Sequence, residues 1–459
     1  MTSWDINLQK PEIFEDRLRE IASGDYVVLV TVATKPDFYK QFPLVLECER
    51  RGVPVGVVHT GQHFDELLGY GLNEFHLDER LVANLNIRGD LSDKFVDLFS
   101  KMVKFGRYLL KNFPGTEFIP VVHGDTLTAG VVPLAWSYGL GRKCVQNEAG
   151  LRGMYPNSMF DFVRGVIDFE EFIDSQWTLD WSIDRNEPFP EQIDTFICGS
   201  SCFCFIAPHE INYENLVREG YDPELIPVCG NSVVDAVEYT RNHKPENSIF
   251  EVYPQLEQDY WLRVDIHRRG NLTESRFKNI IHAIKKLVVD YKMNVCLVEL
   301  TAMRTGLEYY GLTDYVKKLA EDNKNFLFTP LWKSYSNVIE FFRSGNCWAS
   351  LTDSGSQQEE LNLIDECVPL TCRFNTDRPE SVMCESNILT PPLENLPDFL
   401  HYIYKHDYLS KMKKAPKIYG HNVSKKIIDA IDKIYRKHNT FTWCHEKFLA
   451  KKERGIDYL

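Results

Sequence analysis

CWASLTDSGSQQEEL (residues 347–361) passes from an apolar run through Asp353 and a Ser-Gly-Ser turn into a polar segment with two adjacent glutamates. This order is typical of a buried strand that feeds a helix. The backbone N–H groups at a helix start can bind an anion, and the small residues 354–356 would admit a phosphate. Glu359 and Glu360 would repel phosphate, so we expect them to accept hydrogen bonds from hydroxyl groups of the same ligand, such as a ribose. The stretch therefore indicates a nucleotide site.

An ordinary capped helix is the alternative for the same residues. Asp353 or Ser354 could accept a hydrogen bond from the first turn, and such a cap needs no ligand. On its own the stretch favours this simpler interpretation, and the choice depends on the rest of the chain.

Length and charge limit the class of protein. A chain of 459 residues exceeds what one hydrophobic core usually supports, so we expect two domains. The net charge of −14 argues against nucleic acid or a membrane as a partner. The apolar runs are only strand length, the amino terminus lacks a signal-peptide core, and the cysteines lie mostly in apolar runs. We therefore expect a cytoplasmic protein.

Short β-branched runs alternate with amphipathic segments in both halves of the chain, which predicts an α/β fold of two doubly wound Rossmann-like domains facing across a cleft. We place the join near residues 207–227. Residues 1–207, completed by a carboxyl-terminal helix at 425–459, would form the first domain, and residues 208–424 the second. Residues 154–188 are rich in acids and aromatics, and we expect them to be an insertion in the first domain. The insertion would be a surface elaboration, a lid or a subunit contact.

Four polar residues follow predicted strands or turns and could do chemistry: Asp125, Glu148, Glu191 and His267. Strand ends converge in a doubly wound domain, so Asp125 and Glu148 could share one crevice. Paired carboxylates raise one another's pKa and can exchange protons at neutral pH. His267 precedes two arginines and could bind phosphate. Each could equally be a cap, a loop anchor or part of a solvated loop.

Ten segments, spread from about Tyr26 to Ala430, together resemble the UDP-N-acetylglucosamine 2-epimerases, a family with the two-domain GT-B fold. Each segment is weak alone, but all ten occur in the family's order. They are ATKPDFYK (33–40), HTGQHFD (59–65), VHGDTLTAG (122–130), NEAGLR (147–152), FPEQ (189–192), GNSVVDA (230–236), HRRGN (267–271), TDSGSQQEE (352–360), TDRPES (376–381) and YGHN (419–422).

The resemblance implies a role for each matching residue. It implies that the catalytic residues are Asp125, Glu148, Glu191 and His267. It implies that the turn at 354–356 holds the UDP diphosphate. The substrate contacts that we expect on this basis are Lys35, Lys40, Arg268, Ser354, Gly355, Ser356, Glu360 (on the ribose) and Arg373.

Gln62 and His63 lie in the motif that, in bacterial family members, helps to bind an activating second UDP-sugar. Other positions depart from the family pattern and leave the exact sugar open. They are Ala33, Lys35, Asn147, Gln192, Gly270 and Ser356.

The family reaction is an elimination that inverts carbon 2 of the sugar. A base removes the carbon 2 proton while UDP leaves carbon 1, and re-addition of UDP to the glucal interconverts UDP-GlcNAc and UDP-ManNAc. Hydrolysing members add water instead and release the free sugar. A GT-B glycosyltransferase or a nucleotide-sugar-binding protein is the alternative from another class. We expect a UDP-sugar as substrate, a homodimer, and neither a metal nor a cofactor, because the sequence has no metal-ligand cluster and no GxGxxG after its first strand.

Overall fold

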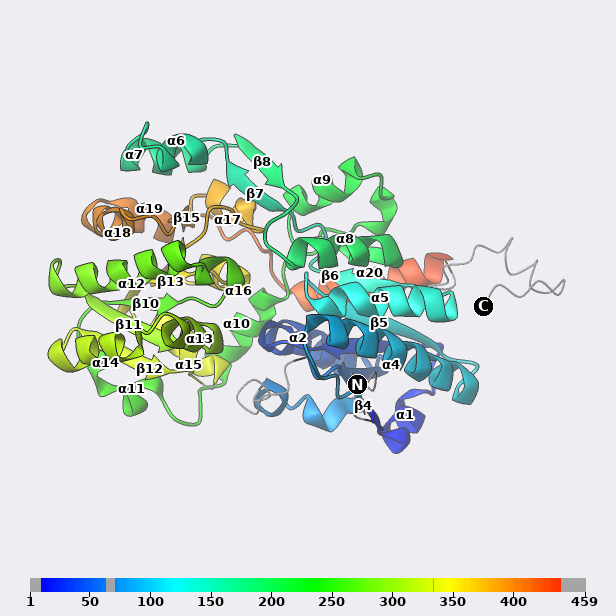
Figure 1. Ribbon diagram of the computed structural model, residues 1–459. Helices are drawn as coiled ribbons and strands as arrows, with labels where there is room; N and C mark the ends of the chain where they lie inside the picture. Colours follow the sequence, from blue (N-terminus) through cyan, green and yellow to red (C-terminus); the bar gives the residue numbers. More distant parts are fainter. Residues whose placement is uncertain (1–9, 63–70, 333, 439–459) are drawn as a thin grey trace, which may run out of the picture. The chain divides into compact units, whose positions relative to one another are not determined.

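The computed structural model describes residues 10–62, 71–332 and 334–438, and the chain divides into two compact α/β units (Figure 1). Unit 1 comprises residues 1–151, 190–236 and 419–459, and unit 2 comprises residues 152–189 and 237–418.

We expected a single boundary between the domains near residues 207–227. Instead the chain passes into unit 2 after residue 151, returns to unit 1 at residue 190, enters unit 2 again at residue 237 and returns at residue 419. It stays in unit 1 as far as Ala236 because backbone hydrogen bonds hold this segment there. Ala207 N donates to Pro227 O, and Asn231 N donates to Tyr419 O. The insertion at 154–188 also belongs to unit 2, not to the first domain as we had expected.

Unit 1 is built on a seven-stranded sheet of order β1-β4-β3-β2-β5-β6-β9, in which only β1 runs antiparallel to its neighbour. Every residue of the central strand β2 is buried, as expected for a parallel strand with helices on both faces. The strands are β1 (Glu12–Ile13), β2 (Tyr26–Val32), β3 (Val55–His59), β4 (Leu81–Asn84), β5 (Glu117–His123), β6 (Cys144–Asn147) and β9 (Cys202–Ile206).

Helices cover this sheet, and α20 near the carboxyl end returns to pack against α2. An ion pair of 2.7 Å between Arg51 and Asp429 joins these two helices. The helices of unit 1 are α1 (Glu15–Ile21), α2 (Lys35–Arg51), α4 (Leu91–Asn112), α5 (Leu127–Leu140), α8 (Glu191–Ser201), α9 (Glu210–Arg218), the start of α10 (Val233–Asn242), and α20 (Val423–His438).

Unit 2 contains a six-stranded, fully parallel sheet of order β12-β11-β10-β13-β14-β15. Its strands are β10 (Trp261–Asp265), β11 (Asn294–Glu299), β12 (Phe326–Pro330), β13 (Cys347–Thr352), β14 (Val368–Thr371) and β15 (Ile388–Leu389). Its helices are α11 (Ile249–Val252), α12 (Glu274–Val289), α13 (Thr301–Tyr309), α14 (Thr313–Asp322), α15 (Tyr335–Arg343), α16 (Gly355–Asn362), α17 (Pro379–Met383), α18 (Leu396–Lys405) and α19 (Tyr408–Lys413).

Both sheets follow the doubly wound pattern, so the predicted fold class is confirmed. The chain order reverses beside β2 in unit 1, where β5 pairs with it, and beside β10 in unit 2, where β13 pairs with it. In open α/β sheets, ligands bind outside the carboxyl ends of the strands at such a switch point. The loops after β2, β5, β10 and β13 are therefore where functional side chains are expected.

In the insertion, β7 (Gly153–Pro156) and β8 (Trp181–Asp184) pair as two antiparallel strands. The chain between them forms the helices α6 (Met159–Val163) and α7 (Phe169–Gln176). Phe162 and Phe172 stack at 3.8 Å and are both buried in the hydrophobic core of unit 2. Gln176 donates to Leu389 O and accepts from Leu389 N. The insertion is thus part of the core of unit 2 and not a surface elaboration.

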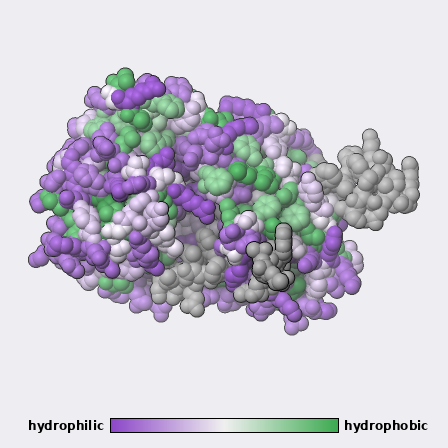
Figure 2. Space-filling model, viewed as in Figure 1, coloured by the Kyte–Doolittle hydropathy of each residue, from purple (hydrophilic) through white to green (hydrophobic). Residues whose placement is uncertain are grey.

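Among the residues that the structure describes, no helix combines the length and apolar character needed to cross a membrane. Hydrophilic residues cover much of the face shown in Figure 2.

Truncating Phe172 tests the role of the insertion. Phe172→Ala removes a fully buried ring, so we expect the free energy of unfolding of unit 2 to fall by about 3–5 kcal/mol. Phe160→Ala is the matched control, because Phe160 lies on α6 with its side chain 57% exposed and should change stability by less than about 1 kcal/mol. Urea titration followed by circular dichroism measures both. Equal, small effects would show that the insertion does not stabilise unit 2.

Candidate active site

Glu148 is the centre of a buried polar network in unit 1. It directly follows β6 with a φ of +63°, a left-handed conformation that is uncommon outside glycine. Lys40 Nζ lies 2.5 Å from Glu148 Oε1, and Asn231 Nδ2 donates to the same oxygen at 2.7 Å. Both charged side chains are almost completely buried. Because the lysine and the amide compensate its charge, Glu148 can be held as a carboxylate inside the protein.

His123 and Asp37 extend this network from the carboxyl end of β5 and the first turn of α2. His123 Nδ1 lies 3.0 Å from Asp37 Oδ1, and His123 Nε2 lies 3.2 Å from Glu148 Oε2. Asp37 is held in turn by the backbone N–H groups of Ala33 and Thr34. The imidazole thus lies between two carboxylates, hydrogen-bonded to Asp37, while its Nε2 atom approaches Glu148 without the alignment of a hydrogen bond.

Asp125 and Glu191 lie at the starts of two helices that pack against each other. Asp125 follows β5 and is buried just before α5, whereas Glu191 is the partly buried first residue of α8. Both act electrostatically on Asp194, in the first turn of α8, which places three carboxyl groups in one cluster. The sequence predicts Asp125 and Glu191 as site residues but not Asp194.

The remaining predicted residues of unit 1 lie in the first motif and in the loop after β3. Lys35 is the partly buried first residue of α2. Gln62 accepts a hydrogen bond of 3.0 Å from Thr128 Oγ1. His63 lies outside the described residues.

His267 follows β10 in unit 2 and sits between two acids. Its Nδ1 lies 3.3 Å from Asp265 Oδ1 and 3.2 Å from Asp353 Oδ1. Burial alone would lower the pKa of His267, but these carboxylates outweigh it and raise the pKa above its ordinary value. The side chain remains 39% exposed, so a ligand can reach the imidazole.

Asp353 organises the loop after β10 rather than capping the helix that follows it. Its carboxylate accepts hydrogen bonds of 2.9 Å from His267 N and Arg268 N, and from Asn271 Nδ2. Ser354 precedes α16, but its side chain makes no capping hydrogen bond. The simpler interpretation of an ordinary capped helix is therefore wrong, because neither candidate cap performs that role.

Arg378 lies against the uncapped start of α16, and two further arginines share its partner Asp377. A Cβ atom added to Gly355 would lie 2.7 Å from Arg378 Cζ, so a side chain at this position would displace the Arg378 guanidinium. Arg373 Nη1 lies 3.0 Å from Asp377 Oδ1, Arg268 Nη2 lies 3.7 Å from Asp377 Oδ2, and Arg378 also contacts Asp377. Such a group of guanidinium ions beside a helix start is suited to binding phosphate.

Glu359 and Glu360 have different surroundings. Arg378 Nε donates to Glu359 Oε1 at 3.1 Å, so Glu359 balances an arginine instead of meeting a ligand hydroxyl as we had expected. Glu360 lies in the same buried helix, as do Ser356 and the rest of α16.

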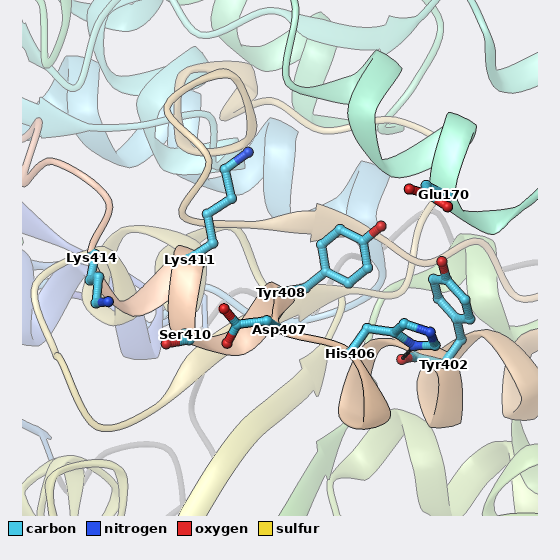
Figure 3. A pocket seen from close by; sticks show the side chains of 8 residues that line it. All are labelled: Glu170, Tyr402, His406, Asp407, Tyr408, Ser410, Lys411 and Lys414. Atoms are coloured by element: carbon cyan, nitrogen blue, oxygen red, sulfur yellow. Dashed lines mark hydrogen bonds between the residues drawn. The ribbon is translucent and has the colours of Figure 1, made fainter.

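In the described part of the chain, no three histidine, cysteine or acidic side chains are grouped as metal ligands. A pocket in unit 2, shown in Figure 3, also lies apart from these residues. Its lining comes from Glu170 of the insertion and from α18, α19 and their connection, and includes Tyr402, Tyr408 and Lys411. None of the predicted site residues lines it.

The family is established by comparison with known proteins. A family model described as UDP-N-acetylglucosamine 2-epimerase matches residues 181–432, more than half of the chain. The chain belongs to the UDP-N-acetylglucosamine 2-epimerase family. This agrees with the resemblance seen in the ten segments.

Individual relatives of this epimerase family are similar over most of their length. The UDP-N-acetylglucosamine 2-epimerase of Methanocaldococcus jannaschii is 27% identical over 374 residues, covering 78% of this chain and 87% of the relative. That of Campylobacter jejuni is 27% identical over 413 residues, covering 86% and 94%. The crystal structure of the M. jannaschii enzyme in complex with UDP-GlcNAc and UDP has a TM-score of 0.70 at 24% identity, covering 89% and 99%.

Among the acids and histidines of the candidate site in unit 1, three were not predicted from the sequence: Asp37, His123 and Asp194. His123 had a usable signal, because it is a polar residue at the end of an apolar strand, two positions before Asp125. Asp37 and Asp194 resemble ordinary first-turn acids of a helix. Only their burial and their partners distinguish them.

The raised pKa of His267 makes a prediction about stability. A histidine whose pKa is higher in the folded than in the unfolded state, where it is about 6.5, stabilises the fold below that value and loses this effect as the pH rises through the folded pKa. We therefore expect the difference in melting temperature between the wild type and His267→Asn to shrink as the pH rises from about 6 to about 9. Differential scanning calorimetry measures it.

His282→Asn provides the control, because His282 is exposed on α12 of the same unit. It should leave the melting temperature nearly unchanged at every pH. A constant difference between the wild type and His267→Asn would contradict the ion pairs described above.

Proposed function

We propose that the protein is a UDP-N-acetylglucosamine 2-epimerase that interconverts UDP-GlcNAc and UDP-ManNAc. The observation that supports this most strongly is the buried Glu148 carboxyl group, which contacts Lys40 and accepts from Asn231 at the end of β6, in a member of this family. The family member from M. jannaschii has been crystallised with UDP-GlcNAc and UDP, which supports the choice of substrate.

The nucleotide would bind to unit 2. The start of α16 offers backbone N–H groups without a side-chain cap, and Arg268, Arg373 and His267 supply positive charge around it. These groups would stabilise the diphosphate as it leaves the sugar, because charge-assisted hydrogen bonds strengthen as negative charge develops. Glu360 would accept from the ribose hydroxyls, with Ser354 and Ser356 beside the phosphates.

The carboxylates of unit 1 would act on the sugar. Lys40 and Asn231 favour the ionised form of Glu148, so we assign it the role of the base that takes the carbon 2 proton. The carbon 1–oxygen bond breaks, UDP leaves with the bonding electrons, and a 2-acetamidoglucal remains. UDP then adds back to carbon 1 while carbon 2 receives a proton on its other face. Asp125 and Glu191 would serve as acid and base on that face, and Lys35 would contact the substrate.

Two other kinds of activity would use some of the same residues. A hydrolysing epimerase would add water at carbon 1 and release free ManNAc. A glycosyltransferase or a binding protein would need the nucleotide site but not the carboxylates of unit 1. The buried Glu148 network and the Asp125–Glu191–Asp194 cluster therefore favour an epimerase over this second group.

We further propose a cytoplasmic homodimer in which Gln62 contributes to an activating UDP-sugar site. The described cysteines are all free, which suits a reducing compartment. Exposed apolar side chains on the insertion, such as Val166 and Leu179, support a contact between subunits. Light scattering with and without UDP-GlcNAc measures the oligomeric state.

Solvent deuterium tests the chemistry. Turnover of UDP-GlcNAc in heavy water should place deuterium at carbon 2 of the product, because the proton removed there exchanges with solvent. Glu148→Gln removes the titratable group, and we expect kcat to fall by about a hundredfold or more while UDP affinity changes little. Mass spectrometry and calorimetric titration provide the two measurements.

Glu210→Gln changes an exposed acid in the first turn of α9 and should leave kcat unchanged. Product without deuterium at carbon 2 would exclude the elimination, and full activity of Glu148→Gln would show that another residue is the base. The product itself distinguishes the activities, because a hydrolysing enzyme yields free ManNAc and UDP.

A further inference from the structure

Asp194 lies in the first turn of α8, three residues after Glu191, so the two side chains share one face of the helix. It is only 5% exposed. Helix α8 approaches α5 closely at Gly130, where an added Cβ atom would lie 3.1 Å from Asp194 Oδ1 and 3.3 Å from its Cα. The carboxyl group of Asp194 therefore packs against the first turn of α5, the helix that begins shortly after Asp125.

No positive charge compensates this carboxyl group. Within the described ranges, Asp194 forms no ion pair with a lysine, arginine or histidine, and its buried Oδ2 atom has no hydrogen-bond donor. Asp125 before α5 and Glu191 on the same helix interact electrostatically with Asp194. Asp194 in turn interacts electrostatically with Cys198, one turn further along α8. Burial raises the pKa of the Cys198 thiol well above its ordinary value, so this group adds no charge.

Burial, followed by the charges of Asp125 and Glu191, raises the pKa of Asp194 to about 8. Asp194 thus carries a proton at neutral pH and loses it in mildly alkaline solution. Glu148 in the same unit, by contrast, has a cation beside it, because its Oε1 atom contacts Lys40 Nζ.

We propose that Asp194 is a positioning residue that holds a proton beside Asp125 and Glu191 and thereby sets the upper pH limit of turnover. The proposal rests on the proposed function. A neutral Asp194 leaves at most two negative charges in the cluster. When it ionises, the third charge repels the negative charge that develops at carbon 2 during proton removal.

The pH dependence of kcat tests this role. For the wild type we expect kcat for UDP-GlcNAc epimerisation to fall by about tenfold between pH 7 and pH 9, following an ionisation near pH 8. Asp194→Asn cannot ionise, so its kcat should fall less over this range than that of the wild type, the remaining fall reporting the loss of charge on His267, and should lie within about threefold of the wild type at pH 7. Asp314→Asn, an exposed first-turn acid of α14, should keep the wild-type profile.

A purely structural role would lower kcat of Asp194→Asn equally at both pH values and leave the alkaline fall in place, and this result would overturn the proposal. A second measurement needs no turnover. In the full chain labelled with ¹³C-aspartate and without substrate, one carboxyl resonance should titrate near pH 8, and Asp194→Asn assigns it. The absence of such a resonance would overturn the proposal even if the variant did not fold.

The two measurements separate this inference from the proposed function. Absence of any turnover of UDP-GlcNAc by the wild type would remove the epimerase assignment, and with it the role in turnover. The NMR titration would still decide whether Asp194 holds its proton at neutral pH.

Discussion

A charge taken out of water must be compensated by an opposite charge or by hydrogen-bond donors, and this constraint shapes both units. In unit 1 the Glu148 carboxylate is buried beside Lys40 and Asn231, which fixes the ends of β6 and α2 relative to each other. In unit 2 the fully buried Asp353 is compensated by two backbone N–H groups and by Asn271. Removing a single partner would leave a buried charge, so the loops that carry these residues have little freedom.

The same sheet topology supports different chemistry in the two units. Each places polar side chains after the two strands that meet at its switch point, β2 and β5 in unit 1 and β10 and β13 in unit 2. In unit 1 these positions hold acids, and the surroundings of each acid decide its protonation. In unit 2 they hold a histidine between two acids and a helix start flanked by arginines. The proposed proton transfer and the proposed anion binding thus fall to separate units of the chain.

The ten motifs, the α/β class, the two doubly wound domains and the strand-end positions of Asp125, Glu148 and His267 could all be predicted from the sequence. They depend on local patterns: alternation of apolar runs with amphipathic segments, and polar residues where runs end. The domain boundaries could not, because they depend on hydrogen bonds between distant segments, such as Asn231 with Tyr419. The insertion was misplaced for the same reason, since its aromatic residues pack on a core formed some 200 residues later, around Phe399.

What each acid does was decided by tertiary structure. Asp353, Glu359 and Asp194 all stand at or near a helix start in the sequence, where a capping or solvated role is the ordinary expectation. In the folded chain Asp353 holds the loop of His267, Glu359 pairs with Arg378, and Asp194 is buried against α5 without a cation. The sequence by itself determined which residue types stand at the strand ends. Only the packing of remote elements decided which of them are buried and which charges they meet, because burial and charge pairing depend on neighbours in space.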